Sequence, residues 1–200
     1  MTLADGYTKV PAGKVAFIAT SLEMLAKPLP RPVPEAKGLT IRAVASPDVE
    51  WYRALYTRVG AEWLWASRLK LSSGDLAAII QHPKVELSAL QAAGHDEGLL
   101  ELDFRVDGEC ELAFFGVTAA MIGRGAGRAL MSHAIEKAWS RPIRRFWVHT
   151  CTGDHPAALQ FYMRSGFVPF ERRVEIADDP RLNGLLPEMV AAHVPIVRKA

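Results

Sequence analysis

The sequence has few of the features that mark secreted, membrane-bound or nucleic-acid-binding proteins. Its 200 residues include two cysteines, which argues against a disulfide framework and suits a reducing compartment. No apolar run approaches the roughly 20 residues that cross a bilayer, and Thr20, Ser21 and Glu23 interrupt the short apolar stretch near the N-terminus. A formal net charge of +2 favours neither nucleic acid nor a membrane surface as partner. The sequence therefore predicts a cytoplasmic protein without a secretory signal.

One prominent boundary interrupts an otherwise ordinary globular composition. Residues 28–34 have proline at every second position, and proline fixes φ and removes a backbone donor. We expect an extended connector there, so that an N-terminal arm with its connector (1–38) precedes a single main domain (39–200). Within the arm we expect a strand at 14–20 and a short helical piece at 22–25. The strand could add to the edge of a sheet or pair with a second copy, which allows a homodimer.

Hydrophobic periodicity in the main domain predicts an α+β fold. Period-two stretches indicate strands, and Val106-Asp107-Gly108 between two of them indicates a hairpin. Capping residues followed by apolar residues at three- and four-residue spacing indicate helices. The expected elements are strands at 39–44, from 85, at 99–105, 109–117, 145–150, 172–176 and 193–198, and helices after an N-cap at Ser46, from Ser72 or Ser73 to about His82, after 123–127 and at 156–165.

The most informative segment is residues 111–130, where a strand leads into glycines at the start of a helix. The first turn of a helix has free N–H groups and the positive end of the dipole, so it can bind phosphate. Arg124 and Arg128 add charge that a pyrophosphate would accept. The glycines alone also fit a tight turn before a helix. There is no Gly-Lys-Ser/Thr, which excludes a P-loop, and the spacing differs from the Gly-x-Gly-x-x-Gly of dinucleotide sites.

Two motifs, in the same order and at the same separation, resemble those of the GNAT superfamily of N-acetyltransferases. The first is a strand that ends at Val117, followed by Ile122-Gly-Arg-Gly-Ala-Gly127. The second is His155-Pro-Ala-Ala-Leu-Gln-Phe-Tyr-Met-Arg-Ser-Gly-Phe167. The sequence departs from the family at Ile122, where Arg or Gln is usual, and at His155, where Asn is usual. The resemblance implies the GNAT acyl-CoA N-acyltransferase fold, a mixed and mostly antiparallel sheet with splayed central parallel strands flanked by helices.

The resemblance also implies a reaction, the direct transfer of an acetyl group from acetyl-CoA to a primary amine, without a metal or an acyl-enzyme. Tyr162 stands where the family has the general acid that protonates the departing thiolate. Glu111 has the spacing of the base glutamate in the histone-acetylating branch. Alternatively, Glu111 is an ordinary strand residue paired across the hairpin with Glu101 or Arg105. Glu101 and Asp103 are further candidate bases on the partner strand.

Positions that match the family's motifs are expected to contact acetyl-CoA. The strand before the loop would hold the pantetheine arm through its backbone, and the amide of Gly116 or Val117 would donate to the thioester oxygen. The loop and the two following helices would bind the rest. The expected cofactor-binding residues are Phe115, Gly116, Val117, Gly123, Arg124, Gly125, Ala126, Gly127, Arg128, His155, Ala158 and Phe161.

Two other functions are compatible with parts of this pattern. A non-catalytic acyl-CoA-binding or sensing module of the same fold would need neither Tyr162 nor a nearby carboxylate. A nucleotide-binding regulatory domain would bind ATP or NAD in place of CoA. No metal site is expected, since the candidate ligands do not form a closed set; they are His149, Cys151, Asp154 and His155.

The acceptor is expected to be an amine of a small molecule or peptide, which the sequence does not identify. In the family the first helices and the loop before the last strand form the acceptor side. Aromatic residues are frequent in the first of these segments, and residues 182–189 are expected in the second. Most of the aromatic side chains have helical spacing and are expected in the core, while a few could line a pocket for an apolar or aromatic amine. They are Trp51, Tyr52, Tyr56, Trp63 and Trp65.

Overall fold

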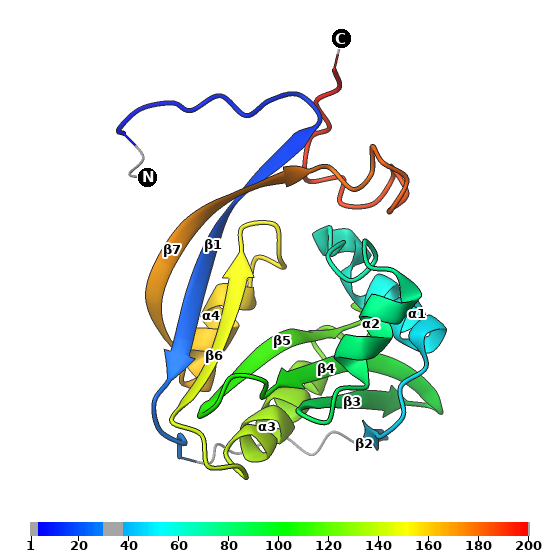
Figure 1. Cartoon of the computed structure of the whole chain (residues 1–200), viewed down its shortest axis with the longest axis vertical. Helices are drawn as coiled ribbons and strands as arrows, with labels where there is room; N and C mark the ends of the chain where they lie inside the picture. The colour runs from blue at the N-terminus through cyan, green and yellow to red at the C-terminus, as the bar shows by residue number, and fades with distance from the viewer. Residues whose placement is uncertain (1–3, 30–37, 200) are drawn as a thin grey trace.

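The computed structural model describes residues 4–29 and 38–199 (Figure 1). Seven strands, four α-helices and two short 3₁₀ helices follow one another along these residues. They are β1 (Lys14–Met24), β2 (Leu39–Val44), α1 (Val49–Gly60), η1 (Ala61–Trp63), α2 (Ser73–Ile80), β3 (Val85–Ala92), β4 (His95–Asp103), β5 (Glu109–Val117), η2 (Ala119–Met121), α3 (Ala126–Ala138), β6 (Arg145–Cys151), α4 (Ala158–Ser165) and β7 (Val168–Asp178).

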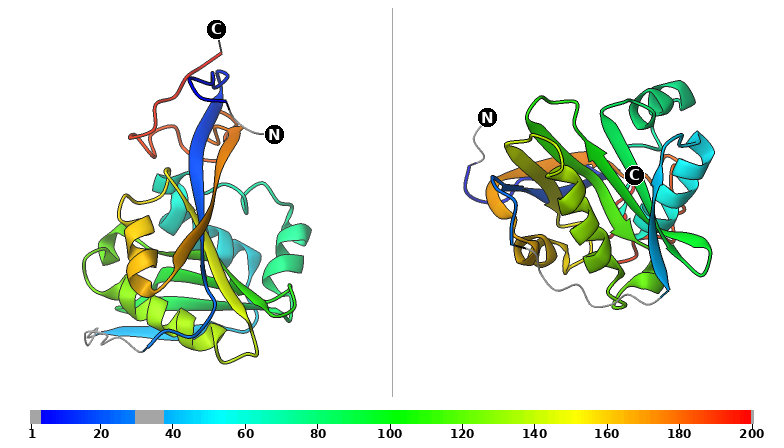
Figure 2. Two further views of the ribbon diagram at one scale, coloured as in Figure 1. Left: turned by 90° about the vertical axis from the view of Figure 1, so that its left-hand side faces the viewer. Right: turned by 90° about the horizontal axis from the view of Figure 1, so that it is seen from below.

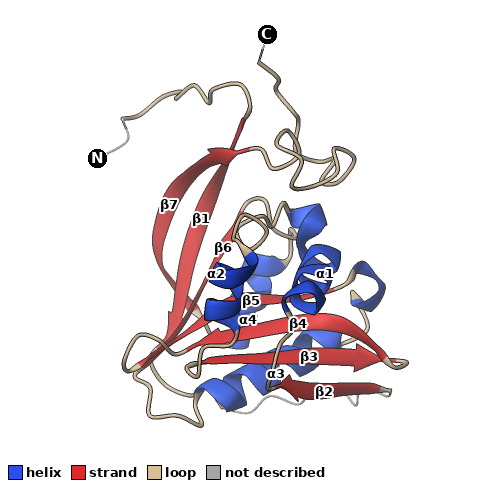
Figure 3. Ribbon diagram, turned by 45° about the vertical axis from the view of Figure 1, so that its right-hand side comes forward, coloured by secondary structure: helices blue, strands red, loops and turns tan. Residues whose placement is uncertain are grey.

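A mixed seven-stranded sheet in the order β2-β3-β4-β5-β6-β1-β7 organises the fold. Neighbouring strands are antiparallel, except that β5 and β6 are parallel. Helices α1 and α2 cover one face, and α3 and α4 cover the other (Figure 3). Each face has its own apolar core, because the strands alternate their side chains between the two layers. This arrangement confirms the predicted α+β fold.

The two central parallel strands separate soon after they meet. Their register joins Glu109–Glu111 of β5 to Arg145–Trp147 of β6 and ends there. On its other side β5 pairs with β4, where the register shifts between Glu101 and Leu102 and places Ala113 at a bulge. A bulge bends the strand and increases its local twist. The strands therefore splay beyond Glu111, as the sequence predicted, and leave a gap next to the start of α3.

The N-terminal strand lies inside the sheet, which corrects the expectation that it adds at an edge. β1 pairs with β6 on one side and with β7 on the other. It also continues to Met24, so the helical piece expected at 22–25 is wrong. Leu22 and Met24 are both buried in the core under α3 and α4. In Figure 2, β1 and β7 form a long twisted ribbon that extends beyond the other strands, and the described segments before β1 and after β7 lie near its tip.

Most of the predicted helix ends are confirmed, but the N-cap of the first helix lies two residues later than predicted. The N-cap of α1 is Asp48 rather than Ser46, because the Asp48 carboxylate accepts a hydrogen bond from the Trp51 amide at 2.9 Å. Ser72 caps α2 in the same way, at 3.1 Å from the Asp75 amide. Gly166 closes α4 with φ 109°, as expected of a left-handed C-cap.

The C-terminal segment is not the strand expected at 193–198. After β7 the chain folds back around the buried Arg181 side chain, which forms an ion pair with Asp179 at 2.8 Å. The same guanidinium donates to the carbonyl oxygens of Val190, Ala191 and Val194. One side chain thus satisfies backbone groups that a strand would have paired with a neighbour.

The proline connector and the domain boundary near residue 38 fall in a segment of which the structure describes only a part. The proline connector at 28–34 lies mostly outside the described residues, and the division into 1–38 and 39–200 stays a prediction.

None of the helices in the described part of the chain is long and apolar enough to cross a membrane.

Candidate active site

A cavity of about 1110 Å³ lies where β5 and β6 diverge. Its walls come from β5 and β6, from the loop and first turn of α3, from α4, and from the segment after α1. Nearly all of the predicted site residues line it, and the exception, Ala126, is buried beneath the loop. The predicted residues that line the cavity are Glu111, Phe115, Gly116, Val117, Gly123, Arg124, Gly125, Gly127, Arg128, His155, Ala158, Phe161 and Tyr162.

The start of α3 has the properties of an anion site. Gly123 and Gly125 both have φ of 79°, a left-handed conformation that glycine adopts without strain. No described side chain caps α3, in contrast to α1 and α2, so the N–H groups of its first turn stay available to a ligand. Arg124 and Arg128 are exposed at the cavity and form no ion pair with any described residue. These donors and charges fit a pyrophosphate.

The two departures from the family's motifs have visible structural consequences. Ile122 lines the cavity with 47% of its surface exposed, and its side chain supplies no donor to a phosphate. His155 accepts a hydrogen bond at Nδ1 from the Ala157 amide at 3.1 Å and packs edge-on against Trp63. The histidine thus stabilises the turn before α4.

Tyr162 occupies the α4 side of the gap, among aromatic rings. It packs edge-on against Phe115, Phe161 and Phe167 and is 7% exposed. Burial, with a smaller contribution from the Asp154 carboxylate, raises the pKa of Tyr162 well above its usual value. The phenol therefore stays protonated at neutral pH, as a general acid must before it donates.

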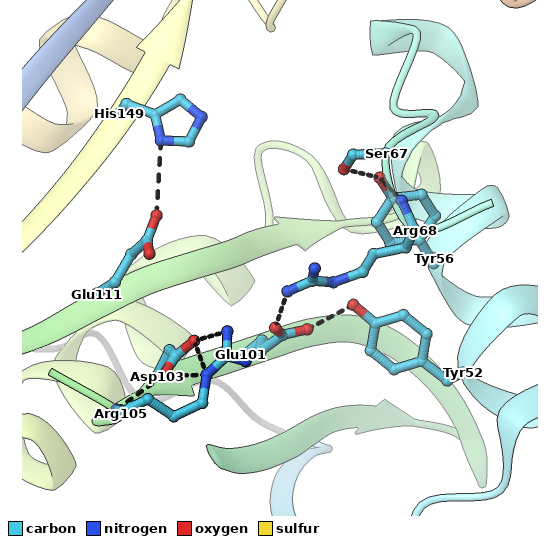
Figure 4. Close-up of polar contacts among 9 residues, drawn as sticks. All are labelled: Tyr52, Tyr56, Ser67, Arg68, Glu101, Asp103, Arg105, Glu111 and His149. Atoms are coloured by element: carbon cyan, nitrogen blue, oxygen red, sulfur yellow. Dashed lines mark hydrogen bonds and ion pairs between the residues drawn. The ribbon is translucent and has the colours of Figure 1, made fainter. Parts of the chain in front are cut away.

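Three carboxylates lie on the opposite, α1 side of β4 and β5, and two of them are neutralised (Figure 4). Glu101 is fully buried; it accepts from the Tyr52 hydroxyl and from Arg68, each at 2.5 Å. Asp103 is paired with Arg105 at 2.6 Å. Both candidate alternative bases are therefore held as partners of arginines.

Glu111 is the carboxylate of this group that lacks an arginine partner among the described residues. It lies opposite Asp103 in the β4–β5 register, so the alternative pairing with Glu101 or Arg105 is wrong. Its nearest basic group is His149 Nδ1, at 3.7 Å (Figure 4). Burial, followed by the charges of Asp103 and Glu101, raises the pKa of Glu111 to about 7. A carboxylate with this pKa can accept a proton near neutral pH.

Gly116 makes the close approach between β5 and α1 possible. A Cβ at this position would lie 2.6 Å from Val59 Cγ1 and 3.3 Å from the Trp65 ring. Any side chain would therefore push α1 away from the strand. This contact brings Trp65 over the cavity, where its indole nitrogen lies 3.3 Å from Asp154.

The contacts of Cys151 and Asp154 indicate that these two residues stabilise the fold at the end of β6. Burial raises the pKa of the Cys151 thiol to about 11, so it is not a thiolate at neutral pH. Asp154 accepts from the Thr150 hydroxyl at 2.7 Å and from the Cys151 amide at 2.8 Å. Within residues 4–29 and 38–199, no group of three or more His, Cys, Asp or Glu side chains is placed to hold a metal ion.

The aromatic residues expected on the acceptor side divide into two groups. Trp63 and Trp65 line the cavity and Tyr56 is buried at its wall, whereas Trp51 and Tyr52 do not line it. The Trp51 indole donates to Asp96 at 2.8 Å. Residues 182–189 were expected in the loop before the last strand. They instead follow β7, which is the last strand of the described residues.

Arg68 and His149 are site residues that the motifs did not identify. Arg68 stands in an irregular segment without periodicity, and its pairing with Glu101 depends on the tertiary fold. Alternation along β6 places His149 on the same face as Trp147 and Cys151. Only the β5–β6 register places that face beside Glu111.

A comparison with protein families matches residues 91–167 to the model of the acetyltransferase (GNAT) family. Residues 91–167 belong to a GNAT acetyltransferase domain. The matched residues include β5, the glycine loop, α3, β6 and α4, which build most of the cavity. The GNAT match therefore covers the same segments as the two sequence motifs. A search of curated proteins gives no significant match to the chain.

Solved GNAT structures share the fold at low sequence identity. A GCN5-related N-acetyltransferase from Sphaerobacter thermophilus is 16% identical, with a TM-score of 0.59 over 88% of this chain and 54% of its own. The ribosomal-protein-S18-alanine N-acetyltransferase from Escherichia coli is 19% identical, with a TM-score of 0.55 over 69% of this chain and 90% of its own. An aminoglycoside acetyltransferase from an uncultured soil metagenomic sample is 15% identical, with a TM-score of 0.54 over 64% and 88%.

These identities establish the fold and leave the substrates open. The chain spans only about half of the Sphaerobacter protein, 54% of its length. The acetyltransferase activities named for the solved structures belong to those proteins.

Proposed function

We propose that this GNAT domain transfers an acetyl group from acetyl-CoA to a primary amine of a small molecule or peptide. One observation supports the proposal above all others. A single cavity brings together the uncapped start of α3, the protonated phenol of Tyr162 and the carboxylate of Glu111. A phosphate-binding helix end, an acid and a base are the three parts that acyl transfer from a CoA thioester requires.

The donor would bind across the splay of the sheet. Its pyrophosphate fits the amides of Gly125 to Gly127 and the side chains of Arg124 and Arg128. Its pantetheine arm would replace the strand contacts that β5 and β6 lose beyond Glu111, with the backbone of Phe115 and Val117 as partners. The amide of Gly116 or Val117 would then donate to the thioester oxygen as negative charge develops there.

The acid and the base approach this gap from opposite faces of the sheet. Tyr162 belongs to the apolar core under α3 and α4, whereas Glu111 lies with Asp103 and Arg105 on the α1 side. The amine would attack the thioester carbon from the Glu111 side and lose a proton to that carboxylate. Tyr162 would donate its proton to the sulfur as the carbon–sulfur bond breaks. The reaction would require no acyl-enzyme, and the raised pKa of the Cys151 thiol is consistent with direct transfer.

The test is release of CoA from acetyl-CoA with a panel of amines that spans amino acids, peptide N-termini, aromatic amines and polyamines. We expect at least one class to accept the acetyl group, with a mass increase of the amine product and none of the protein. A non-catalytic acyl-CoA-binding module would bind acetyl-CoA and give no product with any amine. Acetylated protein that decays on addition of amine would contradict direct transfer.

A further inference from the structure

We propose that His149 is a positioning residue for Glu111 and the outlet through which the proton on Glu111 reaches solvent. This inference rests on the proposed acetyl transfer, in which Glu111 accepts a proton from the amine. It assigns a second residue to the base side of the reaction, contributed by the other of the two splayed strands.

His149 lies beside Glu111 and is the more exposed of the two side chains. Its Nδ1 atom lies 3.7 Å from Glu111 Oε1, across the point where the strands begin to separate (Figure 4). A small side-chain rotation or one bridging water covers this distance. Both residues line the cavity, but the His149 side chain is 47% exposed whereas that of Glu111 is 27% exposed. The imidazole is therefore a path from a largely buried carboxylate to solvent.

The other charged groups near Glu111 cannot serve as that path. Asp103 and Glu101, on β4, are carboxylates held by Arg105 and Arg68. A guanidinium stays protonated and cannot accept a proton. On this side of Glu111, the His149 imidazole is thus the group that can both accept and donate a proton.

The surroundings of His149 on its own side of the sheet also leave it free for this role. On β6 its neighbour Trp147 lies 6.4 Å away between ring centroids, and on β1 it faces Ser21. The nearby Arg145 is engaged by Glu23 at 2.6 Å and by Glu109 at 3.5 Å.

The proton balance of the proposed step is simple. The N–H bond of the attacking amine breaks and an O–H bond forms on Glu111. That O–H bond then breaks while an N–H bond forms on Nδ1 of neutral His149. The imidazolium then releases its Nε2 proton to water, which leaves the ring neutral and protonated at Nδ1. Exchange of this proton with solvent returns it to Nε2 and restores the starting tautomer, while the carboxylate is already restored.

The first test measures the coupling of the two groups without a substrate. The carboxyl ¹³C resonance of Glu111, assigned from its loss in Glu111→Gln, is titrated in the wild type, His149→Gln and the control His95→Gln. His95 is an exposed residue at the start of β4, outside the cavity. We expect the pKa of Glu111 to shift by roughly half a unit in His149→Gln, because two groups 3.7 Å apart that exchange a proton titrate as a coupled pair. An unchanged titration in a folded variant would overturn the proposal.

The second test measures the steady-state rate of acetyl transfer to an amine found in the panel. In His149→Ala we expect kcat to fall about tenfold with an unchanged KM for acetyl-CoA, and added imidazole to restore part of the loss. The control His95→Ala should match the wild type with and without imidazole. A wild-type kcat in His149→Ala, or a loss that imidazole does not restore, would contradict the outlet role. The NMR titration requires no acetyl-CoA, so a failure of acetyl transfer itself would be recognised separately.

Discussion

Glu111 depends more than any other site residue on contacts that are distant in the sequence. The folded protein retains a proton on Glu111 up to a pH of about 7, because the pKa of this carboxyl is raised from the 4.5 of an ordinary glutamate side chain. Since the folded state binds this proton more tightly than the unfolded state, the contribution of Glu111 to stability is present below pH 4.5. It is lost as the pH rises through 7.

Glu111→Gln should remove this pH dependence. We expect the free energy of unfolding of the variant, relative to the wild type, to increase by roughly 2 kcal/mol between pH 4.5 and pH 8, after allowance for solvent screening. Urea denaturation at a series of pH values measures the difference. Glu109→Gln is a suitable control on the same strand, because Glu109 pairs with Arg145. Parallel curves for Glu111→Gln and the wild type would show that Glu111 titrates normally.

Tyr162→Phe tests the role of the Tyr162 hydroxyl as general acid while it keeps the packing of the aromatic rings. Because the phenyl ring keeps the contacts with Phe115 and Phe167, the affinity for acetyl-CoA should change little. Loss of the hydroxyl should lower kcat by about 100-fold or more. Tyr56→Phe is the control, since the Tyr56 hydroxyl contacts Ser67 at 3.2 Å on the other side of the sheet. Equal kcat values for both variants would remove Tyr162 from the catalytic assignment.

The sequence predicted some site residues and missed their partners for a physical reason. Gly125 and Tyr162 stand in motifs whose spacing is fixed by one loop and one helix, so local pattern identifies them. The neighbours of Glu111 come from other strands. Neither the register that places Asp103 opposite it nor the parallel pairing that brings His149 near it has a local signal.

At the scale of elements, strand lengths and the C-terminal segment were the least predictable. Residues Leu22 and Met24 alternate as a strand, but the run Leu22–Leu25 also fits one turn of an amphipathic helix, and the pairing with β6 decides between them. The helices α1 and α2 have side-chain caps and strong spacing, and their predictions needed little correction. The segment after β7 is organised by one buried ion pair, for which sequence gives no periodic signal.

Arg181→Met should unfold that segment. It leaves the buried Asp179 carboxylate without its partner and removes donors from three carbonyl oxygens, so we expect a loss of about 3–5 kcal/mol in stability. Faster hydrogen exchange of residues 185–195, together with thermal denaturation, measures the effect. Arg198→Met removes an exposed pair with Glu188 and should leave the melting temperature nearly unchanged. Similar melting temperatures for the two variants would show that Arg181 does not organise the segment.

At the scale of the whole molecule, the order of strands is the feature that sequence reasoning could not supply. The chain places its first strand between its last two, and it therefore closes the sheet through contacts between residues more than 100 positions apart. Local pattern predicts strands but not which strands become neighbours. The splay of β5 and β6 was predicted because the family motifs imply it.

Removal of residues 1–27 should therefore prevent folding rather than release a smaller domain. β1 contributes both ladders to β6 and β7 and buries Leu22 and Met24. Removal of residues 1–9, which precede the strand, should leave the melting temperature close to that of the full chain. Circular dichroism and thermal denaturation of the two truncated proteins measure whether each one folds. A cooperative, native-like transition in the chain that begins at residue 28 would support the predicted boundary near residue 38 instead.

The most direct test of the central claim is a calorimetric titration with acetyl-CoA, CoA, ATP and NAD. The wild type is compared with Gly127→Glu and with Gly74→Glu as matched control. Both glycines lie in the first turn of a helix, where an added Cβ meets nothing closer than 3.9 Å, but only Gly127 lines the cavity. We predict that acetyl-CoA and CoA bind the wild type and Gly74→Glu, that Gly127→Glu abolishes this binding while it stays folded, and that ATP and NAD bind none of the three. Failure of acetyl-CoA to bind the wild type, or equal binding to Gly127→Glu, would contradict the assignment of this cavity.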